Sequence, residues 1–273
     1  MENTMNPRAL LAVFRTGIAK TAEYRTVLLL TSFAAPALNA GIQGFLWSTV
    51  YHSSGRTHLG NLSESMMVTY CIIAALCYAF TGISRNVRES SEDIRSGGLN
   101  KFLLRPIAHD LYTLAVGLAE KVPIVMMMLV LWAGITFMLP EVMHYGTIGS
   151  VATMCFFLIC GFLIRFFIGL AISYCAFWLE EVWTFHVLTD ISLWFLSGML
   201  VPLSMLPAGV QEIAHYAPFQ YMSYIPASIF MGNIETEIMV FYAFLAVSWV
   251  IILWGLCRLL WWRGIVRFGA YGG

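Results

Sequence analysis

The chain contains apolar stretches that are long enough to cross a bilayer, separated by short polar segments. A helix needs about 20 mostly apolar residues to span roughly 30 Å of hydrocarbon. Charged residues make up only 11% of the 273 residues, whereas an ordinary globular domain is about 25% charged. Because helices satisfy their backbone hydrogen bonds internally, the sequence predicts an all-α membrane protein.

Six transmembrane helices are expected within residues 26–262. They cover residues 26–51, 66–84, 122–139, 147–179, 187–205 and 237–262. The third continues a helix that begins in the cytosol near Ile107, so Glu120 and Lys121 lie at the inner boundary, where charge costs little. The fourth is longer than the bilayer is thick and is expected to tilt or to project into the cytosol.

The distribution of Lys and Arg predicts the orientation. Four of these residues precede residue 26, five lie in residues 85–110 and three lie near the C-terminus, whereas the outer loops contain only Arg56. Because positive charge gathers on the cytoplasmic side, both termini are expected in the cytosol. Residues 6–25 are expected to form an amphipathic helix on the membrane surface.

Residues 85–110 form the one long charged segment of the chain. Residues 88–95 can form a short helix, and Ser96-Gly97-Gly98 is expected to end it. Three large apolar residues, 102–104, then lie between two cations, which favours a surface for a soluble partner. A charge run is often only a solvated loop, and that alternative stays open.

Residues 207–232 are too broken to span a membrane and too apolar for a free loop. Pro207, Pro218 and Pro226 alternate with aromatic residues, which favour the bilayer interface. Short re-entrant helices in the outer leaflet are therefore expected between the fifth and sixth spans. Gly198 and Pro202 supply a bend in the outer part of the fifth span.

Arg165 lies deep inside the fourth apolar stretch. Charge at membrane depth usually faces a bundle interior or a water-filled cavity. Arg165 therefore pairs helices or lines a substrate path, or else it snorkels to the inner surface. The residue types alone leave these interpretations open.

The sequence contains no recognisable catalytic motif. It has no phosphate-binding loop, zinc-protease motif, nucleophile elbow or dinucleotide fingerprint. The six cysteines lack metal-ligand spacing, and no basic cluster suggests nucleic acid. An intramembrane enzyme would depend on Arg165, Asp190 and Glu120, which belong to three different helices.

Three patches resemble one family of membrane proteins. They are residues 94–106 (IRSGGLNKFLLRP), which are similar to the pattern G-x-[LI]-x-x-x-L-x-[RK]-P, residues 177–180 (FWLE), and residues 195–202 (FLSGMLVP). In this order and with the prolines that follow, they resemble the ABC-2 class of ABC transporter permeases over nearly the whole chain. Residues 98–100 (GLN) depart from the more usual polar or acidic residues after the first glycine.

The resemblance implies that residues 1–273 form one transmembrane domain of an ATP-driven exporter in a bacterial cytoplasmic (inner) membrane. Such permeases dimerise with an identical or similar chain and pair with two copies of a separate ATPase subunit. ATP and Mg²⁺ would bind that subunit, so this chain would be non-catalytic and hold no cofactor; its other contacts would be with membrane lipid.

The resemblance also assigns candidate residues to two roles. A coupling helix in residues 85–110 would contact the ATPase through Arg88, Glu89, Glu92, Asp93, Arg95, Phe102, Leu103 and Arg105. A translocation pathway with an extracellular gate would involve Arg165, Phe195, Gly198, Met199, Pro202, Phe219 and Tyr221. The apolar composition favours a hydrophobic or amphipathic cargo. There are two alternatives to the permease function: a membrane anchor or assembly protein without transport activity, or an intramembrane enzyme.

Overall fold

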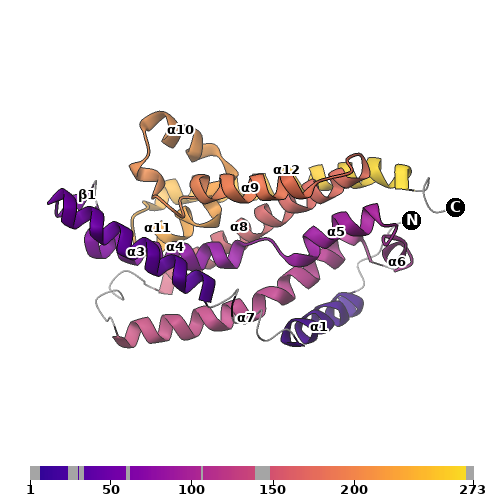
Figure 1. Cartoon of the computed structure of the whole chain (residues 1–273), viewed down its shortest axis with the longest axis horizontal. Helices are drawn as coiled ribbons and strands as arrows, with labels where there is room; N and C mark the ends of the chain where they lie inside the picture. Colours follow the sequence, from indigo (N-terminus) through magenta and orange to yellow (C-terminus); the bar gives the residue numbers. More distant parts are fainter. Residues whose placement is uncertain are drawn as a thin grey trace.

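The computed structural model describes residues 7–23, 30, 34–59, 62–105, 107–138 and 148–268. Within these residues the chain is helical apart from one short hairpin (Figure 1). In chain order the elements are α1 (Pro7–Glu23), α3 (Ala35–Ser54), β1 (His58–Leu59), β2 (Leu62–Ser63), α4 (Glu64–Thr81), α5 (Arg85–Arg95), α6 (Asn100–Leu103), α7 (His109–Met138), α8 (Ile148–Tyr174), the 3-10 helix η3 (Cys175–Phe177), α9 (Trp183–Leu196), η4 (Leu203–Met205), α10 (Ala208–Tyr216), η5 (Pro218–Met222), α11 (Tyr224–Phe230) and α12 (Thr236–Phe268).

Four helical segments among the described residues are long and apolar enough to cross a membrane. They are Glu64–Arg95, His109–Val130, Gly149–Phe177 and Glu237–Phe268. The elements that contain them extend along the long axis of the molecule in Figure 1. These segments overlap the expected second, third, fourth and sixth spans, the third only over residues 122–130, and they make the chain a multi-pass membrane protein.

The two remaining expected spans are not among these four segments. The first lies partly outside the described residues, and its described part is α3. The fifth was expected over residues 187–205 with a bend at Gly198 and Pro202, and its helix α9 ends just before that bend. α9 ends at Leu196 after 14 residues. That is about 21 Å at 1.5 Å per residue, which is less than the hydrocarbon thickness. Gly198 follows with φ 78°, a left-handed conformation that glycine adopts readily and that ends the helix.

The N-terminal helix expected over residues 6–25 is described as α1, from Pro7 to Glu23. It lies against α7. A Cβ atom added at Gly17 would lie 2.8 Å from the Cβ of Ala119, so glycine permits this close approach. The position of α1 relative to a membrane surface stays a prediction.

The proline-broken segment is folded into short helices, α10, η5 and α11, as expected. Nearly every residue from 221 to 231 is buried. The segment is joined to α4 by two side-chain hydrogen bonds. Thr81 Oγ1 donates to the Met222 carbonyl oxygen at 3.2 Å, and Ser223 Oγ donates to the Ala74 carbonyl oxygen at 3.1 Å. η5 and α11 therefore belong to the interior of the bundle, and their depth in a membrane stays a prediction.

Two backbones approach closely where η5 meets α8. A Cβ atom at Gly161 of α8 would overlap the backbone carbonyl of Tyr221. One turn earlier in α8, the ring of Phe157 stacks on that of Tyr221, with centroids 6.1 Å apart. Glycine at position 161 is thus required by the approach of another backbone, which cannot move aside as a flexible side chain can.

We expect Gly161→Ala to lower the free energy of unfolding by about 1–3 kcal/mol, because the added methyl group overpacks this contact. Gly255→Ala in α12 is the control, since a Cβ there meets nothing within 4 Å. Alanine also favours a helix, so the control should be neutral or slightly stabilising. Thermal unfolding in detergent, followed by the reactivity of the buried cysteines, measures both. Equal melting temperatures for the two variants would contradict the packing argument.

Candidate functional site

The segment expected to couple the chain to a partner forms α5 and α6, at one end of the molecule (Figure 1). α5 ends at Arg95, and Gly97 follows with φ 77°. The glycine stop predicted from the sequence is therefore confirmed. The Leu99 N–H donates to the Asp93 carbonyl oxygen at 2.9 Å, which folds α6 back onto the end of α5.

α5 is amphipathic and holds one face against the bundle. Its buried residues are Val87, Ser90 and Ile94, at intervals of three and four. On the other side, Arg85 Nε lies 2.7 Å from Glu89 Oε1 in an exposed pair, and Glu92 is exposed. The helix therefore presents Glu89 and Glu92 outward while its apolar face fixes its position.

Two other predicted coupling residues have partners within the chain. Lys101 Nζ donates to Asp93 Oδ1 at 2.6 Å, which stabilises the turn between α5 and α6. Arg95 Nη1 lies 3.9 Å from Glu181 Oε2, in the connection between η3 and α9. That acidic connection contains no cation of its own, and α5 supplies one.

Phe102 anchors α6 to the bundle. Its ring centroid lies 5.1 Å from those of both His109 and Tyr112 at the start of α7. Lys101 Nζ and the Arg105 guanidinium lie 5.0 and 5.2 Å from the same ring, in cation–π contacts. Phe102 is thus half-buried and turned toward the protein.

Leu103 and Leu104 provide the exposed apolar surface of this segment. Leu103 is 48% exposed and Leu104 is 88% exposed. Arg105 is exposed beside them. Of the three apolar residues expected to need a cover, these two leucines remain uncovered within the chain.

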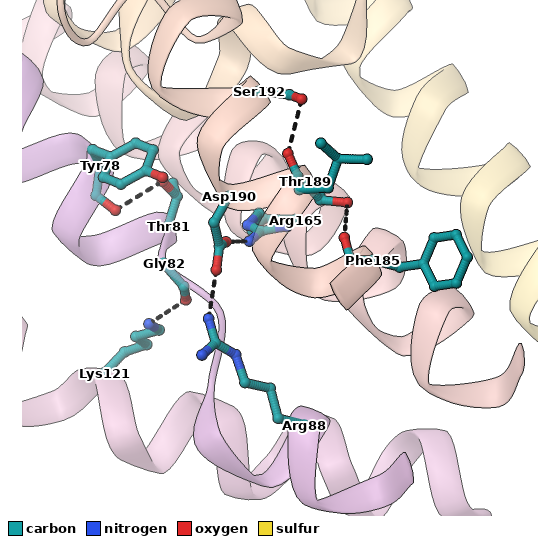
Figure 2. A network of polar contacts seen from close by, with 11 residues as sticks. Tyr78, Thr81, Gly82, Arg88, Lys121, Arg165, Phe185, Thr189, Asp190 and Ser192 are labelled. Atoms are coloured by element: carbon teal, nitrogen blue, oxygen red, sulfur yellow. Dashed lines mark hydrogen bonds and ion pairs between the residues drawn. The ribbon is translucent and has the colours of Figure 1, made fainter. Parts of the chain in front are cut away.

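Arg165 lies at the centre of a polar network between α5, α8 and α9 (Figure 2). It is 2% exposed, and its Nη2 donates to Asp190 Oδ1. The other oxygen of Asp190 accepts a hydrogen bond from Arg88 Nη2 at 2.6 Å. One carboxylate therefore joins two arginines that come from two other helices.

This pairing gives Arg165 the helix-pairing role that the sequence left open. A buried guanidinium is costly unless an opposite charge and hydrogen bonds compensate it. Asp190 supplies that charge from within α9. Arg165 Nη1 has no hydrogen-bond partner among the described residues. A contact of Arg165 with cargo stays a prediction.

A second polar contact joins the same three helices. Ser173 Oγ of α8 donates to the Val87 carbonyl oxygen of α5 at 2.6 Å, and it lies 3.2 Å from Nε2 of His186 in α9. Sequence reasoning missed this role of His186. The signal was its spacing of four residues from Asp190, which places both side chains on one face of a helix.

Glu120 and Lys121 satisfy the backbone where α4 gives way to α5. Lys121 Nζ donates to the Gly82 carbonyl oxygen at 2.6 Å, and the Arg85 N–H donates to Glu120 Oε2 at 3.2 Å. An intramembrane enzyme would use Arg165, Asp190 and Glu120. Arg165 and Asp190 pair with each other, whereas Glu120 binds a backbone group elsewhere, at the junction of α4 and α5. Among the described residues, no cluster of His, Cys, Asp and Glu could hold a metal ion.

The turn after α9 is held by donors from three other elements. The backbone carbonyls of residues 197–199 accept hydrogen bonds in turn from the Tyr224 N–H, the Tyr70 hydroxyl and the Gln43 side-chain amide. Broken backbone inside a membrane protein is tolerated where the protein satisfies its polar groups. Gly198 and Met199, which were predicted to belong to a gate, lie in this turn.

The predicted pathway residues lie in different environments. Phe195 is 61% exposed, whereas Met199, Pro202 and Tyr221 are buried and Phe219 is partly buried. Phe195 and Tyr221 therefore do not share a surface within one chain. The extracellular gate stays a prediction that involves a second chain.

The fold and these contacts define a class: a multi-pass membrane protein whose spanning helices connect, through buried polar contacts, to a charged pair of short helices. Residues 37–272 match the family model described as ABC-2 family transporter protein. Because this match covers most of the chain, the chain belongs to the ABC-2 transporter family. Comparison with curated proteins gives no match.

We expect Asp190→Asn to lower the free energy of unfolding by about 3–5 kcal/mol, because it leaves the buried Arg165 without a counter-charge. The double variant with Arg165→Gln should recover part of this loss, since the cation is then removed as well. Glu89→Gln breaks only an exposed pair and should cost less than about 1 kcal/mol. Thermal unfolding of wild type, these three variants and the Arg165→Gln single variant tests this, and strictly additive losses from the two single substitutions would rule out the pairing.

Proposed function

We propose that this chain is the permease subunit of an ATP-driven exporter. It dimerises with an identical or similar chain, and two copies of a separate ATPase subunit bind and hydrolyse ATP with Mg²⁺. Membership of the ABC-2 transporter family supports this proposal. The observation that carries it is the α5–α6 pair, which combines an uncovered apolar surface with ionic contacts to α9 and to the connection that precedes α9.

The docking surface for the ATPase is formed by Leu103, Leu104 and Arg105, with Glu89 and Glu92 on the neighbouring α5. An apolar centre surrounded by charges is the usual composition of a specific protein interface. The apolar contact supplies affinity, and the charges of both signs fix orientation and permit reversible binding. This role accounts for two leucines that are exposed beside cations.

Movement of α5 reaches α9 through two ionic contacts. Arg88 contacts Asp190 near the middle of α9, and Arg95 lies near Glu181, just before α9 begins. α9 contributes few buried apolar residues of its own, so these contacts determine much of its position. ATP-driven pressure on α5 would thus shift α9 relative to α8.

The far end of α9 leads to the predicted gate. Residues 197–199 are held by α3, α4 and α11 through their carbonyl oxygens. A shift of α9 would therefore move Gly198 and Met199 against those elements. In this mechanism the chain transmits force and performs no chemistry itself.

The proposed topology has six spans and both termini in the cytosol of a bacterial inner membrane. α3 supplies the first span, and α9 with the turn and η4 that follow it, up to residue 205, supplies the fifth. α3 carries an exposed apolar face that water would not favour: Leu38, Ile42, Phe45 and Leu46. Residues 207–232 would enter from the outer side. The cargo is hydrophobic or amphipathic, in keeping with the apolar and aromatic composition.

Replacing Leu103 and Leu104 with Ser should abolish co-purification of the ATPase subunit from native membranes, because both side chains are removed from the docking surface. Ile213→Ser is the matched control. The exposed fraction of Ile213, 74%, lies between those of Leu103 and Leu104, but Ile213 belongs to α10, which lies at a distance from α6 in Figure 1. If the wild-type chain also purifies folded but without an ATPase, the result would favour the alternative function of a membrane anchor or assembly protein.

Arg88→Gln should leave the ATPase bound but reduce its stimulation by the permease about tenfold, the size of a typical coupling energy between sites. The substitution removes the contact with Asp190 and leaves the docking surface intact. Arg85→Gln, which loses only an exposed pair with Glu89, should behave like wild type. ATP hydrolysis by the purified complex, compared with the ATPase subunit alone, measures the effect. Full stimulation by the Arg88 variant would exclude this route of coupling.

A further inference from the structure

An apolar cavity of about 370 Å³ lies between α4, α7 and α8, with Phe230 of α11 at its back. Each helix contributes residues from a single face; on α4 these include Thr69, Ile73, Leu76 and Phe80. Helix faces with this spacing normally interlock with their neighbours. Here three such faces leave a space that falls within the size range of ligand sites.

The lining excludes a polar ligand. Thr69 carries its only hydroxyl group, and that hydroxyl donates to the Ser65 carbonyl oxygen at 2.8 Å. Cys77 and Cys155 add weakly polar thiols. A polar group placed in this cavity would lose its hydrogen bonds to water without replacement. The occupant must therefore be hydrocarbon.

The shape of the cavity favours a chain over a compact ring. Along α4 the lining runs from Thr69 to Phe80. Eleven residues at 1.5 Å each correspond to about 16 Å along the helix axis. A space elongated along the spanning helices has the direction of the acyl chains in a bilayer.

The cavity opens toward the surface of the bundle. Leu129 of α7 and Ile159 of α8 are both more than half exposed at its rim, whereas Cys77 and Leu158 are buried at its back. In a multi-pass membrane protein this flank faces lipid hydrocarbon. None of the residues predicted for the translocation pathway lines the cavity, which argues for a resident lipid rather than cargo.

One end of the cavity is closed by aromatic rings. The centroid of Phe80 lies 6.0 Å from that of Phe162, and Lys121 Nζ lies 5.7 Å from the Phe162 ring. Beyond these rings is the polar layer at the junction of α4 and α5. A lipid chain would therefore end against Phe80, with its glycerol end near Thr69 and Val151, close to the beginnings of α4 and α8.

We propose that this cavity binds one acyl chain of a bilayer phospholipid, with its methyl end against Phe80. This binding site goes beyond the transport function and does not depend on it, since it requires only that the chain spans a membrane.

The test uses the full-length chain in vesicles that contain a phospholipid with a diazirine near the methyl end of one acyl chain. After illumination, adducts should concentrate near Phe80, in residues 76–80 of α4 and 155–159 of α8. Leu76→Trp fills the cavity and should reduce these adducts to the level found in α12. Leu256→Trp, the same substitution at an exposed position of α12, should leave them unchanged.

A second measurement does not depend on a variant. Cys155 is the exposed cysteine of the described residues and lines the cavity, so a bound acyl chain should slow its reaction with N-ethylmaleimide. Removing lipid with detergent should speed the reaction, and added phospholipid should slow it again. Two results would overturn the proposal: adducts that are spread equally over α4, α8 and α12, or a reaction of Cys155 with N-ethylmaleimide whose rate does not change when phospholipid is removed or added. Native mass spectrometry that finds a non-lipid compound in the site would also overturn it, in favour of cargo.

Discussion

The carboxylate of Asp190 determines how α5, α8 and α9 fit together. It contacts Arg165 and Arg88 at once, and so compensates a guanidinium that is almost fully buried. Without it, the cost of burying Arg165 would be several kcal/mol. α9 itself buries only His186 and Leu193 among its helical residues. Its position therefore depends on directed polar contacts more than on apolar packing, and such contacts can have two discrete arrangements.

The same principle governs each interruption of the long helices. Where α4 gives way to α5, the side chains of Glu120 and Lys121 satisfy backbone groups. After α9, three consecutive carbonyls accept hydrogen bonds from α3, α4 and α11. In η5, Thr81 performs this task for Met222. Unpaired backbone groups are costly in hydrocarbon, so polar residues in this apolar chain gather at the breaks.

Features that depend on the pattern of neighbouring residues in the sequence were predictable. These are the long apolar helices, the glycine that ends α5 after Arg95 and the short helices of residues 207–232. The partner of Arg165 was not predictable, since Asp190 is 25 residues away in sequence and belongs to another helix. Phe102 was expected on the exposed surface with Leu103 and Leu104, but its ring packs against the rings of His109 and Tyr112 in α7. The end of α9 was predictable in part: Gly198 and Pro202 indicated a bend, but the local pattern did not show that the helix stops at Leu196, before both of them.

The two ion pairs of Asp190 differ in a way that bears on coupling. The side chain of Arg88 is 43% exposed, whereas that of Arg165 is 3% exposed. Water can replace the carboxylate around Arg88 at little cost, but it cannot reach Arg165 as readily. The contact with Arg88 is therefore the one that can form and break as α5 moves, whereas Asp190 keeps its contact with Arg165. While the Arg88 contact is formed, a displacement of α5 would shift α9 relative to α8, and when the contact breaks α9 would return, which is the behaviour that a reversible coupling element requires.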